Sequence, residues 1–403
     1  MPHTNGDAPR RLIYLDHAAT TPLDPGVLDA MLPFLTTNFG NPSATYSLAK
    51  EAGAAVERSR KAVASILGCK PREVVFTAGG TESINAAIKG VAFAQQQARR
   101  GQHIITSTIE HHAVLHTCQH LERFGFEVTY VPVDHLGRVD PSDVDRAITE
   151  QTVLVSIMAA NNEVGTIQPI ADIAAVVAAR ASQLGRRIPF HTDAVQAPNS
   201  IALAELTKHV DLLSLAAHKF RGPKGAGVLY LRRGVPFLAQ QNGGGQERQR
   251  RAGTENVAGI VGTAEALRLT QATLDGDRAR IEALSARLRS GIADSISGTT
   301  MNGDPEHRLA NNVSATFEGA DAVELLTALD EAGVACSSGA VCGSTTMEPS
   351  HVLLAMGMPL ERAVSTLRFS PGHQTTADDI EDVLATLGAI VERARAKGVA
   401  ATH

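Results

Sequence analysis

The feature that most constrains the fold is an alternation between short apolar runs and longer segments of helical periodicity, from about Tyr14 to Leu231. Apolar runs bounded by polar turns are typical of buried strands. A repeated strand–helix order predicts a mostly parallel sheet covered by helices. The strand candidates are residues 74–76, 103–107, 127–133, 153–158, 189–191, 212–215 and 227–231.

A second, shorter alternation follows a glycine-rich segment at 242–248. A long helical stretch is predicted over 257–292, and this stretch leaves the first domain. The remainder predicts a smaller α/β domain. Its strand candidates are 312–317, 334–336 and 367–370, and its helix candidates are 322–332, 352–356 and a last helix from Asp378.

Composition excludes several classes of protein. Lys and Arg number 37 against 42 Asp and Glu, a net charge of −5 without any basic block, so neither direct nucleic-acid binding nor anionic-membrane binding is expected. The chain lacks an N-terminal apolar segment and any run near the ~18 apolar residues of a membrane span, which makes a cytoplasmic location the default. Four cysteines are too few for a disulfide framework, so free thiols are expected.

Two polar residues follow neighbouring strand candidates. Asp193 comes shortly after the run 188–190, and Lys219 comes shortly after the run 212–215. Ligands meet α/β sheets at strand ends. A desolvated lysine can attack a carbonyl, and an acid beside it can pair with a pyridinium nitrogen. This is the arrangement that pyridoxal phosphate (PLP) requires, although either residue alone is more often a surface residue.

Three other strand ends carry polar residues. Residues 77–83, TAGGTES, lie between a strand and a helix, where glycines and the helix N-terminus can hold a phosphate, although the segment is neither a dinucleotide nor a Walker A motif. His111 follows the strand 103–107 and can stack on a flat cofactor. Asn162 follows the strand 153–158 and is a candidate hydrogen-bond donor.

A metal site is a competing interpretation of the histidines. His112, His116 and His120 recur every four residues and would share one helix face. No carboxylate or cysteine completes a ligand set at a familiar spacing, and polar helix faces are usually solvated. No metal is therefore expected.

The chain resembles the cysteine desulfurases, PLP enzymes of the aspartate-aminotransferase fold (fold type I) in the class V aminotransferase family. The resemblance covers nearly the whole chain, in order. It rests on YLDHAATTP at 14–22, GNPS at 40–43, FTAGGTES at 76–83, EH at 110–111, NNEVG at 161–165, DAVQ at 193–196, HK at 218–219, GGGQER at 243–248, RAGT at 251–254, SSGAVC at 337–342 and EPSHVL at 348–353.

The resemblance implies a large PLP-binding domain over 24–262 and a small domain over 11–23 and 263–403, with 1–10 as a disordered leader. It implies that Lys219 bonds to the cofactor aldehyde and later takes the substrate Cα proton. Asp193 would hold the pyridine nitrogen protonated. The other expected cofactor-binding residues are Gly80, Thr81, His111, Asn162, Gln196, His218, and Thr254, the last reaching the other subunit of a homodimer.

Two further residues would define the substrate and the reaction. Arg368 matches the family's arginine for the substrate carboxylate, with Asn162 nearby, and a guanidinium binds a carboxylate with two parallel hydrogen bonds. Cys342 lies in a Gly/Ser-rich stretch without periodicity, 337–346, which predicts a mobile loop. Its spacing to Glu348 matches the short-loop, group I type. Cys342 would take sulfur from the PLP-bound substrate as a persulfide.

The expected activity is conversion of L-cysteine to L-alanine, with sulfur passed to an acceptor for iron–sulfur assembly or thiolation. A selenocysteine lyase or another PLP-dependent β-lyase is the alternative, and an inactive scaffold of the same fold is an alternative of another class. Three residues depart from the family pattern. Ala216 replaces a serine or threonine, Tyr46 replaces a histidine, and Cys336 is an additional cysteine, for which burial is favoured over a role in sulfur transfer.

Overall fold

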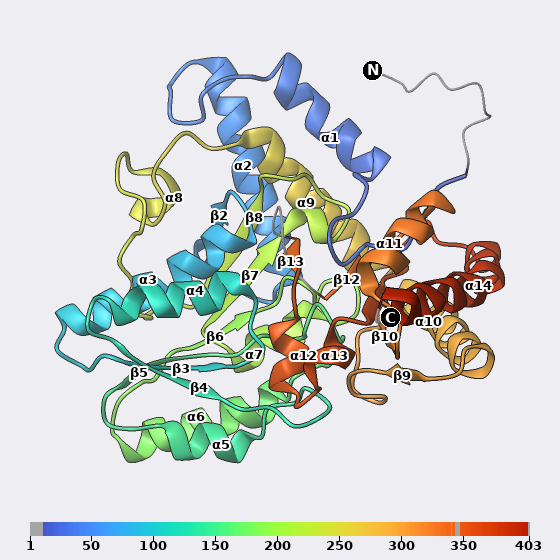
Figure 1. Ribbon diagram of the computed structural model, residues 1–403. Coiled ribbons are helices and arrows are strands. Elements are labelled where there is room, and N and C mark those ends of the chain that lie inside the picture. The colour runs from blue at the N-terminus through green and yellow to red at the C-terminus, as the bar shows by residue number, and fades with distance from the viewer. Residues whose placement is uncertain (1–10, 340, 343–346, 402–403) are drawn as a thin grey trace.

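The computed structural model describes residues 11–339, 341–342 and 347–401. Within them, a seven-stranded sheet in the order β2-β8-β7-β6-β5-β3-β4 forms the centre of the molecule (Figure 1). All neighbouring strands are parallel except β8, which is antiparallel to both β2 and β7. The strands are β2 (Val74–Thr77), β3 (His103–Ser107), β4 (Glu127–Val131), β5 (Thr152–Ser156), β6 (Phe190–Asp193), β7 (Leu212–Ala216) and β8 (Gly227–Leu231).

The mostly parallel α/β sheet expected from the sequence is therefore confirmed. β3 and β8 have the predicted bounds, and the other strands differ at their ends by one or two residues. The prediction succeeds because both faces of the sheet are covered: every strand except the edge strand β4 is buried along its whole length, and most of these strands are rich in apolar residues. In β2, for example, Val75 packs into one core, whereas Val74 and Phe76 pack into the core on the opposite face.

Helices cover both faces. α3 and α4 belong to the core on one face, and α1, α2, α5, α6, α7 and α9 contribute to the core on the other. The bounds are α1 (Pro25–Thr36), α2 (Ser47–Ile66), η1 (Pro71–Glu73), α3 (Gly80–Gln97), α4 (His112–Glu122), α5 (Pro141–Ala147), α6 (Ile170–Gln183), α7 (Leu203–His209), η2 (Ala217–Lys219), α8 (Gln246–Gln249) and α9 (Val257–Ala272), where η denotes a 3₁₀ helix.

The prediction of one helical stretch over 257–292 was wrong at its centre. The chain forms two helices, α9 and α10 (Leu274–Ser295), which are separated at Thr273. The Thr273 hydroxyl donates to the carboxylate of Asp277 at 2.7 Å, and both Asp275 and Asp277 lie in the first turn of α10. Acidic residues favour a helix N-terminus, so they mark the start of a new helix.

The C-terminal part of the chain builds a second sheet in the order β12-β15-β10-β9, whose paired strands are antiparallel. In Figure 1, α10, α11 and α14 gather to one side of the large sheet. Residues from near the N-terminus join this part, because β1 pairs with β11 and Ile13 and Leu15 enter its core. The bounds are β1 (Ile13–Tyr14), β9 (Thr299–Met301), β10 (Val313–Phe317), α11 (Ala322–Glu331), β11 (Val334–Ala335), β12 (Ser337–Ser338), α12 (His351–Ala355), α13 (Leu360–Ala363), β15 (Thr366–Phe369) and α14 (Ala377–Ala401).

The stretch 337–346, expected to be irregular, contains regular pairing. β12 pairs with β15, and β13 (Val341–Cys342) pairs with β14 (Met347–Glu348). The prediction was wrong for these strands because β12 pairs with the distant strand β15, and β13 and β14 have only two residues each, so none of them leaves a local periodicity. The side chain of Cys342 and the expected leader at 1–10 lie outside the described residues. No described helix is long and apolar enough to cross a membrane.

Candidate active site

A cavity of about 410 Å³ opens where β5, β6 and β7 end, the edge at which α/β sheets bind ligands. Segments that are far apart in the sequence meet there, including the turn after β1 and the start of the stretch that leads to Cys342. Most of the residues predicted from the sequence line this cavity: Gly80, Thr81, His111, Asn162, Asp193, Gln196, His218, Lys219 and Arg368.

Lys219 lies at the end of η2, directly after β7. Its Nζ donates to the carbonyl oxygens of Ala18 and Ala19 at 2.6 and 2.7 Å, so the amine is held in the cavity. Burial, and next the positive charge of Arg368, lower the pKa of Lys219 to about 8, against the opposing effects of Asp16 and Asp193. A lysine in this environment can supply a neutral amine near neutral pH.

This lowered pKa makes a testable prediction about the cofactor-free chain. Only the neutral amine of Lys219 can attack an aldehyde, so the rate of Schiff-base formation with added PLP should rise with pH and level off above about 8. Absorbance after rapid mixing at a series of pH values measures this rate. A rate that instead keeps rising toward the ordinary lysine range would contradict the desolvated state of Lys219.

Asp193 is the last residue of β6 and is 6% exposed. Its Oδ1 accepts a hydrogen bond from the Val195 backbone N–H at 2.9 Å. Burial raises the pKa of Asp193 to about 6, although this hydrogen bond and the charge of Lys219 oppose the rise. A buried carboxyl of this kind favours a cationic partner, and a pyridinium N–H would be one.

The N-terminus of α3 forms a tight, polar wall of the cavity. A side chain at Gly80 would place its Cβ 2.9 Å from Val195, so only glycine fits. The N-cap residue of α3 is Gly79, which provides no side-chain cap and so leaves the first backbone N–H groups of the helix for an anion. His218 lies close by, with Nδ1 3.2 Å from the Thr20 hydroxyl. These groups suit a phosphate.

His111 and Gln196 hold fixed positions on the cavity wall. His111 caps α4, since its Nδ1 accepts from the Ala113 N–H at 3.0 Å. Burial, followed by the charge of Lys219, lowers the pKa of His111 to about 4, so the ring is neutral and suited to stacking. Gln196 donates from Nε2 to the Ala18 carbonyl at 3.0 Å.

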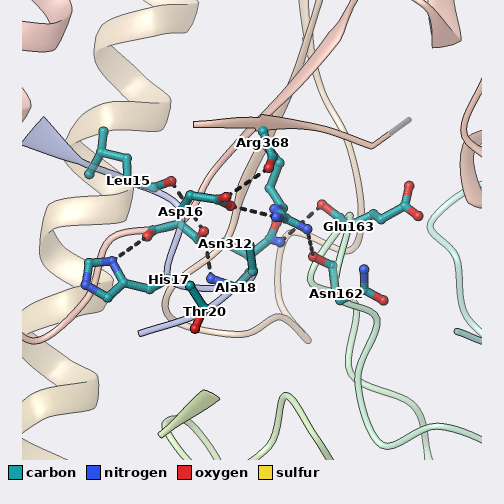
Figure 2. Close-up of polar contacts among 12 residues, drawn as sticks. Leu15, Asp16, His17, Ala18, Thr20, Asn162, Glu163, Asn312 and Arg368 are labelled. Carbon is teal, nitrogen blue, oxygen red and sulfur yellow. Dashed lines mark hydrogen bonds and ion pairs between the residues drawn. The ribbon is translucent and has the colours of Figure 1, made fainter. Parts of the chain in front are cut away.

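Arg368 lies in β15 and is 6% exposed. Its Nη1 donates to the Asn162 carbonyl at 3.0 Å, and its Nη2 donates to Asp16 Oδ1 at 2.7 Å. Figure 2 shows the guanidinium between Asp16 on one side and the segment of Asn162 and Glu163 on the other. A planar cation in the cavity wall can bind a carboxylate.

One predicted residue does not join this group. Thr254 is exposed and lines a separate surface hollow with Phe39 and Asn41. The side chain of Cys342 lies outside the described residues, but Ser337, Ser338 and Gly339, shortly before it, line the cavity.

The departures from the family pattern have different surroundings. Ala216 lines the cavity beside Gly80. Tyr46 is 55% exposed at the start of α2, and nothing in the structure explains its identity. Cys336 lies between β11 and β12 and packs against the core of the small sheet, where burial raises its thiol pKa to about 12. A thiol in that state is poorly nucleophilic.

Several residues of the site were not assigned a role from the sequence. The most important is Asp16, which lay within a motif but is separated from Arg368 by 352 positions. Glu163 is another: burial raises its pKa to about 7, and it accepts a hydrogen bond from the Ser350 hydroxyl, near the far end of the Cys342 segment. The available signal was that Asp16 and Glu163 each lie within one of the quoted motifs, YLDHAATTP and NNEVG.

The histidines on α4 do not assemble a metal site. The rings of His112 and His116 lie 4.9 Å apart, and His351 approaches His112 at 4.7 Å. Within the described ranges, no group of three or more histidine, cysteine or acidic side chains is arranged to hold a metal ion.

The fold and this lysine–aspartate site place the protein in a known class. The family model "Aminotransferase class-V" matches residues 13–383, and the chain belongs to this family. Its relatives include the cysteine desulfurase IscS of Methanosarcina thermophila, 48% identical over 97% of this chain and 95% of that protein.

Solved structures agree with this placement. A structure titled "NIFS-LIKE PROTEIN" has a TM-score of 0.88 and 37% identity, covering 95% of this chain and 100% of that one. Another, "SspA in complex with cysteine", has a TM-score of 0.78 and 36% identity, covering 90% of this chain and 100% of that one. The described sheet and cavity therefore have the PLP fold type I architecture of these relatives.

Proposed function

We propose that this chain is a PLP-dependent cysteine desulfurase that converts L-cysteine to L-alanine and transfers the sulfur to Cys342. One observation carries the proposal. A single cavity brings together a half-buried lysine, a buried aspartate and a buried arginine, and its wall includes Ser337, Ser338 and Gly339, shortly upstream of Cys342. The relationship to proteins named cysteine desulfurase, and to one solved with cysteine, supports this substrate.

The residues present fit PLP. Lys219 would hold its aldehyde, Asp193 its pyridine nitrogen and His111 its ring face. The phosphate would lie at the N-terminus of α3, where the absence of a Cβ at Gly80 leaves room, with His218 beside it. Bound PLP would supply an electron-withdrawing ring that stabilises negative charge at the substrate Cα.

The protein's own side chains would orient the substrate and transfer protons. Arg368 would orient the substrate through its carboxylate, which directs the Cα–H bond toward Lys219. The neutral amine of Lys219 would accept the Cα proton at Nζ, because burial has already lowered its pKa to about 8. Because its Nδ1 accepts from the Ala113 N–H, the neutral ring of His111 carries its proton at Nε2 and can donate it there.

Cys342 completes the reaction. Its thiolate attacks the substrate sulfur, the carbon–sulfur bond breaks, and a sulfur–sulfur bond forms. The former Cβ gains the electron pair and a proton. L-Cysteine and the Cys342 thiol thereby become L-alanine and a Cys342 persulfide, with no external oxidant or reductant. The persulfide sulfur would pass to an acceptor protein for iron–sulfur assembly or thiolation.

Replacing Cys342 with serine tests the sulfur-transfer step. A serine hydroxyl cannot form a persulfide, so we expect L-cysteine turnover to fall by at least about 100-fold while PLP stays bound. Alanine formation and mass mapping after a single turnover measure this effect. Cys336→Ser is the matched control and should retain turnover, because Cys336 packs against the core of the small sheet and burial raises the pKa of its thiol. Sulfur mapped to Cys336 in the wild-type protein would contradict the assignment.

The Cys342→Ser variant also distinguishes a desulfurase from the alternative activities. A selenocysteine lyase or another β-lyase would keep most of its release activity in Cys342→Ser, because the departing atom would not need the thiol. An inactive scaffold of this fold would show neither a PLP absorbance band nor turnover. Loss of cysteine turnover with the band retained is the outcome specific to a desulfurase.

A homodimer that shares its active sites also belongs to this proposal. Thr254 is exposed beside a surface hollow of about 250 Å³ formed with residues 34–42. Four exposed apolar side chains lie on and after α1, namely Leu28, Leu32, Leu35 and Phe39, and the last two line the hollow. Such a patch is typical of a protein–protein interface, which supports a position for Thr254 at the partner subunit's phosphate.

A further inference from the structure

The buried guanidinium of Arg368 is held by a carboxylate that contributes to no step described above. The side chains of Arg368 and Asp16 are 8% and 17% exposed, and Nη2 lies 2.7 Å from Asp16 Oδ1. A buried charge is costly unless it is paired and hydrogen-bonded. Asp16 therefore maintains Arg368 as a buried cation in the cavity wall.

We propose that Asp16 is a positioning residue for the substrate carboxylate: it holds the Arg368 guanidinium in the orientation that receives an amino acid. This inference rests on the proposed function, because it assigns Arg368 to a substrate carboxylate. Figure 2 shows the two side chains pointing toward each other across the site.

The arrangement leaves Arg368 able to bind a second carboxylate. A guanidinium has five N–H donors. Nη2 uses one on Asp16, and Nη1 uses one on the carbonyl of Asn162 at 3.0 Å. Nε is buried and has no hydrogen-bond partner among the described residues. One edge of the planar group is thus fixed by the protein, while donors remain for an incoming carboxylate.

Asp16 is itself rigidly placed. Its backbone forms a bridge with Ser370, next to the strand that carries Arg368. The Tyr14 hydroxyl donates to the Asp16 carbonyl at 3.0 Å, and Oδ2 accepts from the Ser337 hydroxyl at 3.0 Å. Because these contacts fix the carboxylate before any ligand arrives, the arginine loses little conformational freedom on binding.

Asp16 also connects Arg368 to the catalytic lysine. Its carbonyl accepts from the Ala19 N–H at 3.0 Å and so closes the turn in which the carbonyls of Ala18 and Ala19 receive Lys219 Nζ. The Arg368 guanidinium, which would bind the carboxylate, and Lys219 Nζ, which would take the Cα proton, therefore both form hydrogen bonds with one short segment, residues 16–19. These shared contacts would fix the distance between the two groups.

The experiment compares two ligands of the holoenzyme that differ only in the carboxylate, L-alanine and ethylamine. Binding is followed through the PLP absorbance in the wild type, Asp16→Ala and Asp16→Asn. We expect Asp16→Ala to weaken L-alanine binding by about tenfold or more and ethylamine binding by less than about twofold. Asp16→Asn keeps an oxygen acceptor for Nη2 and should show an intermediate loss. The KM for L-cysteine should rise more than kcat falls.

Ser337→Ala removes only the second partner of Asp16 and should change L-alanine affinity less than Asp16→Ala does. The proposal is overturned if Asp16→Ala binds L-alanine as well as or better than the wild type, or if both ligands weaken equally. If Asp16→Ala does not fold, the same comparison is made with Asp16→Asn. A wild-type holoenzyme that binds neither ligand, or does not turn over cysteine, would instead contradict the proposed function.

Discussion

Replacing Lys219 with alanine is expected to abolish the Schiff-base absorbance of the holoenzyme and to reduce cysteine turnover by at least about 1,000-fold. Among the described residues, no other lysine lines the cavity to substitute for this amine. The Ala18 and Ala19 carbonyls hold Lys219 inside the cavity, and burial lowers its pKa to about 8. Spectra of the purified protein and alanine production measure the two effects.

Lys208→Ala provides a matched control. Lys208 lies on α7 with its side chain 60% exposed and paired with Glu205, so its loss should alter neither the spectrum nor turnover. A Lys219→Ala variant with an unchanged absorbance band would show that another lysine holds the cofactor. Such a result would remove the basis for the proposed site.

The second large effect is on stability. Arg60 on α2 and Glu247 on α8 form an ion pair at 2.7 Å, with side chains only 4% and 3% exposed. Arg60→Ala should lower the free energy of unfolding by about 3–5 kcal/mol, because it leaves the Glu247 carboxylate buried and unpaired. Urea unfolding followed by far-UV circular dichroism measures the change.

Arg58→Ala is the control for this prediction, because Arg58 lies on the same helix and pairs with Glu51 at 2.8 Å on the surface. Exposed pairs contribute less than about 1 kcal/mol, so a small effect is expected. Equal losses in the two variants would mean that helix propensity, not the buried pair, governs the result. The pair matters for the site because Glu247 also accepts the Phe76 N–H at 3.1 Å, just before the segment proposed to hold the phosphate.

Much of the fold followed from local patterns. The apolar runs at 103–107 and 227–231 are strands with the predicted bounds. A strand that is buried on both faces is rich in apolar residues, and such a run can be recognised in the sequence. The helices α1 and α2 were not predicted. The buried face of α2 consists largely of alanine and the rest of the helix is rich in charged residues, so few large apolar side chains mark this helix in the sequence.

The approximate positions of Lys219 and Asp193 also followed from the sequence. Asp193 is the last residue of β6, and Lys219 ends the short helix that follows β7. Parallel strands bring their carboxyl ends to one edge of a sheet, so residues far apart in the chain become neighbours. The same argument applied to His111 and Asn162, which line the same cavity. The sequence therefore specified which residue types are gathered at that edge.

The protonation and the charge pairing of those residues depend on the tertiary structure. The lowered pKa of Lys219 depends on burial and on Arg368, which lies in the other sheet. The contact between Asp16 and Arg368 joins residues 352 positions apart, and no local periodicity encodes it. Strand and helix patterns arise from neighbours within a few residues, whereas charge pairing and desolvation depend on what the completed fold places alongside each group. The sequence alone determined which side chains are gathered at the site. The packing of the N-terminal turn against the C-terminal sheet determined the orientation and the charge of those side chains.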